Sequence, residues 1–425
     1  MMYLYKRHIV FAIKCYLILF ACFAIPLFLQ SQGVSPLLQE VTDNNLELKI
    51  LHNEYLTALE KAPQVSQLPD PEVGVSTFLL PIETRLGPQI FRVGATQMIP
   101  WKGLLNSKKK LELSKAKVLH QRIAIHQLEL NYQLQKEWLQ LYEIQKSQAI
   151  LRQNIPLLDA LEKQALAAVE SGKEMGEKVL KINLEVEELR QQIAILKVSE
   201  ATPLANINQL LNRPLDMPIA ITDSLHFATI LYSKDTLRQF IQANHPMIRM
   251  LESKKEVAQN GLKVNELESK PDFGVGVDYI MTNRLENSFF ENNGRDVFIP
   301  RVSVKLPLYK KKYQAKEREE NLRIETLNVQ KANATNQMMA TIEKAITDYE
   351  MAKLQLNLFE KQIIIIQSAI RIMEANFSTN ENNFSELLKL EKELIGYKLD
   401  KLKAIIKSHQ AKILIDKFVN YTPNF

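Results

Sequence analysis

The sequence predicts a mainly α-helical protein with a small transmembrane β part, built from two copies of one unit. Three observations carry this prediction: a repeat offset by 200 positions, a shortage of turn-forming residues, and short segments in which apolar and polar side chains alternate. Each copy of the unit reads as a helix, a pair of strands and a long helical hairpin.

Two pairs of matched segments define the repeat. NNLELKIL begins at Asn44 and NHPMIRML at Asn244, while PEVGV begins at Pro71 and PDFGV at Pro271. Both pairs keep the same offset of 200, so chance is a poor explanation. Self-similarity at a period near half the chain indicates that one supersecondary unit was duplicated.

The predicted organisation is a signal peptide over 1–31, a first repeat over 32–232 and a second repeat over 233–425. The first repeat contains a helix, a strand pair over 71–99, a helical hairpin over 102–200 and a linker over 201–232. The second contains a helix over 235–268, a strand pair over 272–306 and a helical hairpin over 308–419. Only 12 glycines and 17 prolines occur among 425 residues, which favours long uninterrupted elements.

The N-terminal segment reads as a secretory signal peptide. Basic residues precede a mostly apolar stretch over 9–29, and polar residues follow it. The alternative is a transmembrane anchor, but the uncharged part over 15–29 is shorter than the ~20 residues of a span. Both cysteines, Cys15 and Cys22, lie inside it, so the mature chain would have no disulfide. Residues 19–22 resemble a lipobox, which leaves lipidation of Cys22 open.

Long helices follow the strands in both copies. Between Lys102 and Ser171 there is one proline and one glycine, which allows a helix of roughly 105 Å at ~1.5 Å per residue. In the second copy, apolar residues mostly three or four apart form a seam: Ile342, Ile346, Tyr349, Leu356, Phe359, Ile363, Ile366, Ile370, Met373 and Phe377. The returning helix carries two stripes: Leu388, Ile395 and Leu402, and Leu399, Ile406 and Ile413. Two stripes indicate two helical neighbours and disfavour an isolated two-stranded rod.

The short segments between the helices alternate as membrane strands do. Over 272–280 one face carries only apolar side chains: Phe273, Val275, Val277 and Tyr279. A half-buried soluble sheet gives the same pattern. The long loops predicted over 79–89 and 282–296 favour a transmembrane barrel instead.

Four strands cannot close such a barrel. Bacterial barrels have at least ~8 strands, and open sheet edges are not tolerated in hydrocarbon. We therefore predict a homotrimer in which three chains share one 12-stranded barrel. The helices of the three chains would then pack side by side and bury both stripes.

Two stretches of the first strand pair carry a family resemblance. IETRLGPQ at Ile82–Gln89 and QMIPW at Gln97–Trp101 are similar to VETRxGPQ and QMFPW in many Bacteroidota members of the TolC-type outer membrane efflux family. The resemblance covers essentially the whole mature chain. It implies a trimeric barrel in the outer membrane of a Gram-negative bacterium, continued by an α-helical coiled-coil tunnel in the periplasm. The implied partners are a periplasmic adaptor protein, an inner-membrane transporter and outer membrane lipid.

The ends of the hairpins are candidate docking sites. The helices break at Gly172 in the first copy and near Thr379 in the second, where asparagines replace the expected glycine. The family's tip pattern falls beside these breaks and ends in a glutamate, Glu185 or Glu391. The residues assigned to adaptor docking are Gly172, Leu180, Thr379 and Leu387. The alternative for the two leucines is packing inside their own hairpins.

Glu374 and Glu381 lie beside the second break and are the candidate periplasmic gate. Threefold symmetry would turn each carboxylate into a ring, and such rings favour cations at a constriction. The alternative is that both are solvated residues at helix ends.

Nothing in the sequence indicates catalysis or a resident metal. It lacks GxxxxGK[ST], HExxH and GxSxG, and His120 and His126 are six apart, so they do not share a helix face. Beyond the signal peptide there are 51 basic and 48 acidic residues, and their charges alternate along helices instead of gathering into a basic patch. We therefore expect no enzyme, no cofactor and no nucleic-acid partner.

These predictions favour an outer membrane exit channel of a tripartite efflux system, a passive duct for solutes delivered by the pump and adaptor. The resemblance over 83–101 slightly favours heavy-metal ions as the transported substrate, exported by an RND-type system. One alternative is the exit duct of a type I protein secretion system. A periplasmic adaptor would carry one hairpin and soluble β domains, and a purely structural coiled coil would leave the strand pairs unexplained.

Overall fold

The structure is a computed structural model that describes residues 34–170, 176–221, 224–286, 289, 291–377 and 384–419. The predicted signal peptide and Cys22 lie outside the described residues. The chain forms two compact units. Among the described residues, unit 1 holds those within 34–43, 134–227 and 359–406, and unit 2 holds those within 44–133, 228–358 and 407–419.

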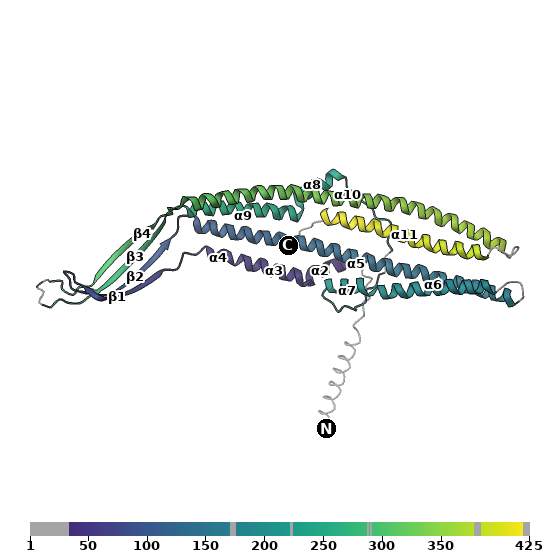
Figure 1. Cartoon of the computed structure of the whole chain (residues 1–425), viewed down its shortest axis with the longest axis horizontal. Helices are drawn as coiled ribbons and strands as arrows, with labels where there is room; N and C mark the ends of the chain where they lie inside the picture. Colours follow the sequence, from purple (N-terminus) through teal and green to yellow (C-terminus); the bar gives the residue numbers. More distant parts are fainter. Residues whose placement is uncertain are drawn as a thin grey trace, which may run out of the picture. The chain divides into compact units, whose positions relative to one another are not determined.

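The predicted fold class is confirmed, because helices dominate and the strands form one small antiparallel sheet (Figure 1). The helices of the first repeat are α2 (Val34–Asn44), α3 (Leu46–Leu59), α4 (Lys61–Val65), α5 (Leu104–Glu170), α6 (Glu177–Ser199) and α7 (Ala201–Leu210). Those of the second are α8 (Lys234–Asn244), α9 (Pro246–Glu268), α10 (Lys310–Phe377) and α11 (Phe384–Val419). The strands are β1 (Glu72–Ile82), β2 (Gln89–Ile99), β3 (Asp272–Thr282) and β4 (Val297–Lys305).

The four strands lie side by side in chain order within unit 2 (Figure 1). Val75 pairs with Val93, Gly94 with Asp278, and Val275 with Val302. The first loop is shorter than the predicted 79–89, because β1 shifts its register after Thr77 and pairs again at Ile82. The shift adds residues to one strand without breaking the sheet.

The helix predicted over 235–268 is two helices, and the break has a local cause. Pro246 is the first residue of α9, where its missing N–H costs no hydrogen bond. His245 caps α9, since its Nδ1 accepts a hydrogen bond from the Met247 N–H at 3.2 Å. Burial of this imidazole, with the nearby Lys417 ammonium, lowers its pKa to about 4, so the ring is neutral and can accept.

The segment predicted as a linker over 201–232 begins with a helix, α7. Beyond α7, the buried Asn208 side chain donates to the carbonyls of Leu215 and Met217 at 3.1 and 2.8 Å. One amide therefore fixes the turn that follows the helix.

The long helices have their apolar seams where the sequence places them. α5 and α10 contain 67 and 68 residues, which makes each roughly 100 Å long. In unit 1 the buried cluster joins α5, α6 and α11 through Leu158, Ile182 and Ile395. In unit 2 a second cluster joins α8, α10 and α11 through Ile241, Ile342 and Ile415. Across the described residues, no helix has both the length and the apolar character needed to traverse a lipid bilayer.

Candidate functional site

One face of the sheet is apolar and exposed. The pairing register places these side chains on that face: Val73, Val75, Phe273, Val275, Tyr279, Met281, Phe298, Val302 and Val304. Val302 is 76% exposed and Val73 68% exposed. Ile99 of β2 pairs with Phe273 and is also exposed, so the apolar surface draws on all four strands. Such a surface is unusual for a protein that remains in water, and it indicates a surface that another apolar phase covers.

The opposite face carries a charged cluster. The Arg92 guanidinium donates to Asp278 at 2.7 Å, and the Arg301 guanidinium lies 3.8 Å from the same carboxylate. Arg301 also donates to the Thr96 hydroxyl at 2.6 Å. The Asp278 side chain is only 5% exposed, whereas both arginines are partly exposed. The cluster thus joins β2, β3 and β4 on the polar face.

Glycines make room for this cluster. A Cβ on Gly94 would lie 2.2 Å from a carboxylate oxygen of Asp278, and one on Gly276 would lie 2.9 Å from the Thr96 hydroxyl. The alternating glycines of the strands therefore have a steric role. Sequence reasoning missed the ion pair itself, since Arg92 and Asp278 are 186 positions apart.

We expect Asp278→Ala to lower the free energy of unfolding by about 2 kcal/mol, because two guanidiniums would lose their common partner. A fully buried pair would lose about 3–5 kcal/mol, but the exposure of the arginines reduces the effect. The midpoint of thermal unfolding in detergent measures it. Asp70→Ala removes an exposed carboxylate beside the same sheet and serves as the control. Equal midpoints for the two variants would contradict the role of Asp278.

Aromatic and polar contacts fix the helices to the sheet. The Trp101 backbone N–H donates to the Asp272 carboxylate at 3.3 Å, and the Trp101 ring stacks on Phe273 at a centroid distance of 6.1 Å. Trp101 also packs against the buried pair Leu104 and Val264. These contacts tie the first turn of α5 and the end of α9 to the strands.

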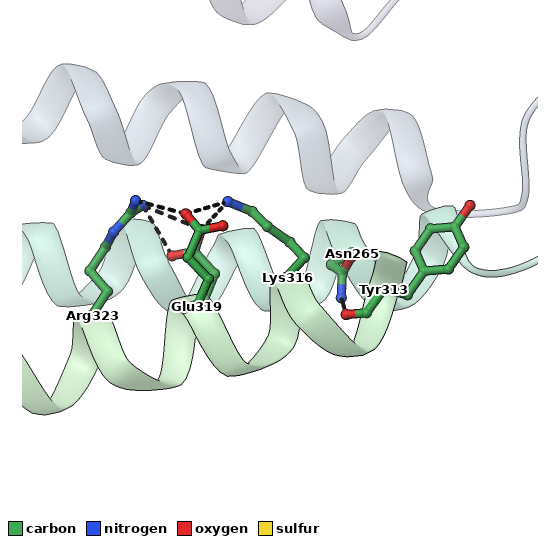
Figure 2. A network of polar contacts seen from close by, with 6 residues as sticks. Asn265, Tyr313, Lys316, Glu319 and Arg323 are labelled. Atoms are coloured by element: carbon green, nitrogen blue, oxygen red, sulfur yellow. Dashed lines mark hydrogen bonds and ion pairs between the residues drawn. The ribbon is translucent and has the colours of Figure 1, made fainter. Parts of the chain in front are cut away.

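A hydrogen bond joins α9 to α10, and a network of ion pairs follows it along α10 (Figure 2). The Asn265 side chain donates to the Tyr313 carbonyl at 2.9 Å. Further along α10, the Glu320 carboxylate accepts from Lys316 at 2.8 Å and from Arg323 at 3.2 Å. Glu320 is 3% exposed and lies against Gly261, whose absent side chain leaves the space that the carboxylate fills.

The four predicted docking residues differ in what the structure shows of them. Gly172 and Thr379 lie outside the described residues. Leu180 is 65% exposed on α6, and Leu184, one turn later, is 72% exposed. Leu387 is 4% exposed and packs with Ile366, Ile370 and Leu394, so it takes the alternative role inside its own hairpin. The periodicity of the seam on α10 was the sequence signal for this packing.

The predicted gate is described only in part. Glu374 is exposed on α10, and Glu381 lies outside the described residues. The structure adds a group that the gate prediction did not include, the buried Glu391 on α11. Burial raises the pKa of Glu391, the nearby Glu374 carboxylate raises it further, and Lys398 partly opposes both effects.

The two glutamates that end the tip pattern have different surroundings. Glu185 accepts from the Lys392 ammonium at 3.0 Å, and Glu188 accepts from the same ammonium at 2.8 Å. This three-residue bridge links α6 to α11 and raises the pKa of Lys392. Glu391 directly precedes Lys392 on α11, yet its side chain is buried and does not take part in this bridge.

We expect the stability of the hairpin to fall as pH rises, through Glu391. Its folded pKa is raised above the ordinary 4.5, so the protonated form stabilises the fold fully below 4.5, and this contribution is lost as pH rises through the folded pKa. Glu391→Gln should therefore raise the thermal midpoint at pH 8 more than at pH 4. The control is Glu393→Gln, an exposed carboxylate on the same helix. A pH-independent effect of Glu391→Gln would contradict the assignment.

The histidines do not form a metal site in the described part of the chain. His126 lies 2.6 Å from the Glu47 carboxylate, and His120 packs against the Tyr55 ring. Among the residues that the structure describes, no three acidic, histidine or cysteine side chains converge as metal ligands.

Comparison with known proteins identifies the fold. No family model matches the sequence, and neither does any curated protein. Among solved structures, CusC, described in relation to transmembrane channel formation, matches with a TM-score of 0.72 and 14% identity over 92% of this chain and 93% of that chain. The outer membrane protein VceC of Vibrio cholerae matches with a TM-score of 0.69 and 12% identity, over 91% and 95% of the two chains.

The MtrE outer membrane channel of Neisseria gonorrhoeae matches with a TM-score of 0.69 and 14% identity, over 91% of this chain and 88% of that one. All three matches span both repeats, so they involve the sheet as well as the hairpins. The chain has the TolC-type fold of outer membrane channels.

Proposed function

We propose that this chain is the outer membrane exit channel of a tripartite efflux system, a passive duct and not an enzyme. The observation that carries the proposal is the two-faced sheet: exposed apolar side chains on one face, a charged cluster on the other, and no more than four strands in the described part of the chain. In a barrel, the apolar face meets lipid and the charged face meets water.

The proposal requires three chains. β1 and β4 are the outer strands of the sheet, and each has one edge that no other described strand pairs with. Joining β4 of one chain to β1 of the next, three times, gives a closed 12-stranded barrel with no free edge in hydrocarbon. The same symmetry would place the hairpins around a water-filled tunnel in the periplasm of a Gram-negative bacterium.

The mass of the purified protein in detergent and its conductance in planar bilayers test this proposal together. We expect a complex of three chains that forms water-filled channels. A stable, folded monomer would remove the argument from the open sheet edges. A trimer that never conducts would support assembly but overturn the function of a duct.

The gate is part of the same proposal. Glu374 and Glu381 would form carboxylate rings near the hairpin ends, and removing both charges as Glu374→Gln/Glu381→Gln should abolish any cation preference. Single-channel recording in a salt gradient measures the preference as a reversal potential. Unchanged selectivity and resting conductance would show that both residues are merely solvated.

The partners follow from the exposed part of the hairpins. Leu180 and Leu184 present apolar side chains beside the first hairpin end. A helical hairpin of a periplasmic adaptor would pack against these two side chains. The adaptor would connect the channel to an inner-membrane transporter, which selects the cargo.

Heavy-metal ions are the cargo that the resemblance over 83–101 suggests. A gene deletion distinguishes metal efflux, drug efflux and protein secretion. The deletion strain is tested for its tolerance to metal salts, for its tolerance to lipophilic drugs and for its export of a protein substrate. Sensitivity to metals alone supports heavy-metal efflux. Loss of protein export alone would instead assign the chain to type I secretion.

A further inference from the structure

Basic side chains gather where the strands join the helices in unit 2. A lysine triplet lies at 108–110 in the first turns of α5, and a second lies at 310–312 at the start of α10. Each triplet belongs to a segment, 102–117 or 305–318, with six basic residues and one acidic residue. We name these two segments the basic collar.

The neighbouring ends of α4 and α9 do not cancel this charge. Residues 60–72 and 263–272 add three basic and six acidic residues, so the four segments together hold 15 basic and eight acidic residues. This surplus of seven exceeds the +6 of the whole chain. The expectation that charges do not gather into a basic patch is therefore wrong at this end of unit 2.

Several collar lysines are exposed and have no anionic partner among the described residues. Lys108 pairs with Glu268 at 2.9 Å. For Lys109, Lys110, Lys310 and Lys311, however, no carboxylate of the described residues lies within ion-pair distance. Like charges at adjacent positions repel one another, so an external anion would stabilise this surface.

A groove at the same place can accommodate a phosphate-bearing group. It has a volume of about 710 Å³ and lies between the end of α9 and the start of α10. Its lining includes Lys263, Lys310, Asn265 and Gln314, which offer N–H donors to phosphate oxygens. Glu266 and Glu317 also line it, so the groove itself is neutral and the surplus positive charge comes from its rim.

We propose that the basic collar binds the headgroups of anionic phospholipids. The inference rests on the proposed function, which puts the apolar face of the sheet in hydrocarbon and hence the strand ends at headgroup level. Val304, exposed on the apolar face, precedes Lys310 by only six residues. Clusters of lysines beside a membrane-spanning element attract anionic lipids, and the two repeats of three chains would supply six such segments.

Native mass spectrometry of the full-length protein tests the proposal. The protein is incubated in neutral detergent with equal amounts of phosphatidylglycerol and phosphatidylcholine, and the retained lipids are counted. We expect phosphatidylglycerol to be retained on the order of tenfold over phosphatidylcholine at low salt, and this preference to shrink at high salt. Lys109→Gln/Lys110→Gln/Lys310→Gln/Lys311→Gln should abolish it.

The matched control removes four exposed lysines elsewhere: Lys163→Gln/Lys344→Gln/Lys353→Gln/Lys361→Gln. The control should keep the wild-type preference. Equal retention of both lipids, or undiminished preference in the collar variant, overturns the proposal. So does inorganic phosphate that displaces phosphatidylglycerol more strongly than sodium chloride of the same ionic strength, because it would show a site for free phosphate.

Planar-bilayer recordings on the same preparations separate this inference from the proposed function. If the protein shows no lipid preference but forms conducting channels in pure phosphatidylcholine, only the proposed lipid binding by the collar is overturned. Protein that forms no channel in any lipid would overturn the proposed function instead.

Discussion

Replacing Val302 by arginine is expected to eliminate the assembled protein from the outer membrane. Val302 is 76% exposed in the middle part of β4, on the apolar face and opposite Val275 on β3. An arginine on the lipid face of a barrel costs about 2–4 kcal/mol near the bilayer midplane, and a trimer would contain it three times. The measurement is the amount of heat-resistant oligomer in isolated outer membranes.

The next residue provides the control. Ser303 lies opposite Gly274, so its side chain points to the polar face. Ser303→Arg adds the same charge one position away but directs it into the proposed lumen. We expect this variant to assemble and to change only conductance. Equal membrane levels of the two variants would show that the apolar face does not contact lipid.

Replacing Leu180 by glutamate is expected to reduce efflux to the level of a gene deletion while the trimer still assembles. Leu180 is 65% exposed beside the first hairpin end, and a glutamate there would bring an unpaired carboxylate into an apolar contact, which is costly. Tolerance to the exported compounds and co-purification of the adaptor measure the loss. Normal tolerance together with normal co-purification of the adaptor would contradict the hypothesis that the adaptor docks at this hairpin end.

Two further variants separate docking from stability. Ile195→Glu changes an exposed isoleucine on the same helix, 15 positions further from the hairpin end, and should leave efflux intact. Leu387→Glu places a charge in the buried cluster with Ile366 and Ile370. Because a buried charge is costly, this variant should lower the thermal midpoint of the oligomer, unlike Leu180→Glu.

Much of the fold follows from the sequence because its signals are local and periodic. The seam that includes Ile342 and Ile370 recurs at helical spacing, so the sequence already shows which face of α10 is buried. The strand with Phe273 and Val275 alternates at a period of two, so its faces are equally readable. Because the unit is repeated, each pattern occurs twice in the sequence, and the two copies predict the same order of helices and strands.

Local patterns were less informative at the boundaries. The His245–Pro246 pair ends one helix and caps the next, yet the sequence analysis predicted a single helix over 235–268. A proline in this segment does not by itself show that a new helix begins, because proline also occurs at the first position of helices. The hydrogen bond from the Met247 N–H to the His245 ring shows that a new helix begins at Pro246.

The sequence by itself determined the duplicated unit, the two-faced strands and the long hairpins, because each depends on neighbours a few residues apart. Only the tertiary structure decided that Asp278 joins Arg92 to Arg301, that Leu387 is buried while Leu180 is exposed, and that Glu391 is enclosed. These contacts join residues on different strands or helices. Their partners are set by strand register and by the rotation of one helix against another, and neither quantity is encoded in the spacing of residues along a single element.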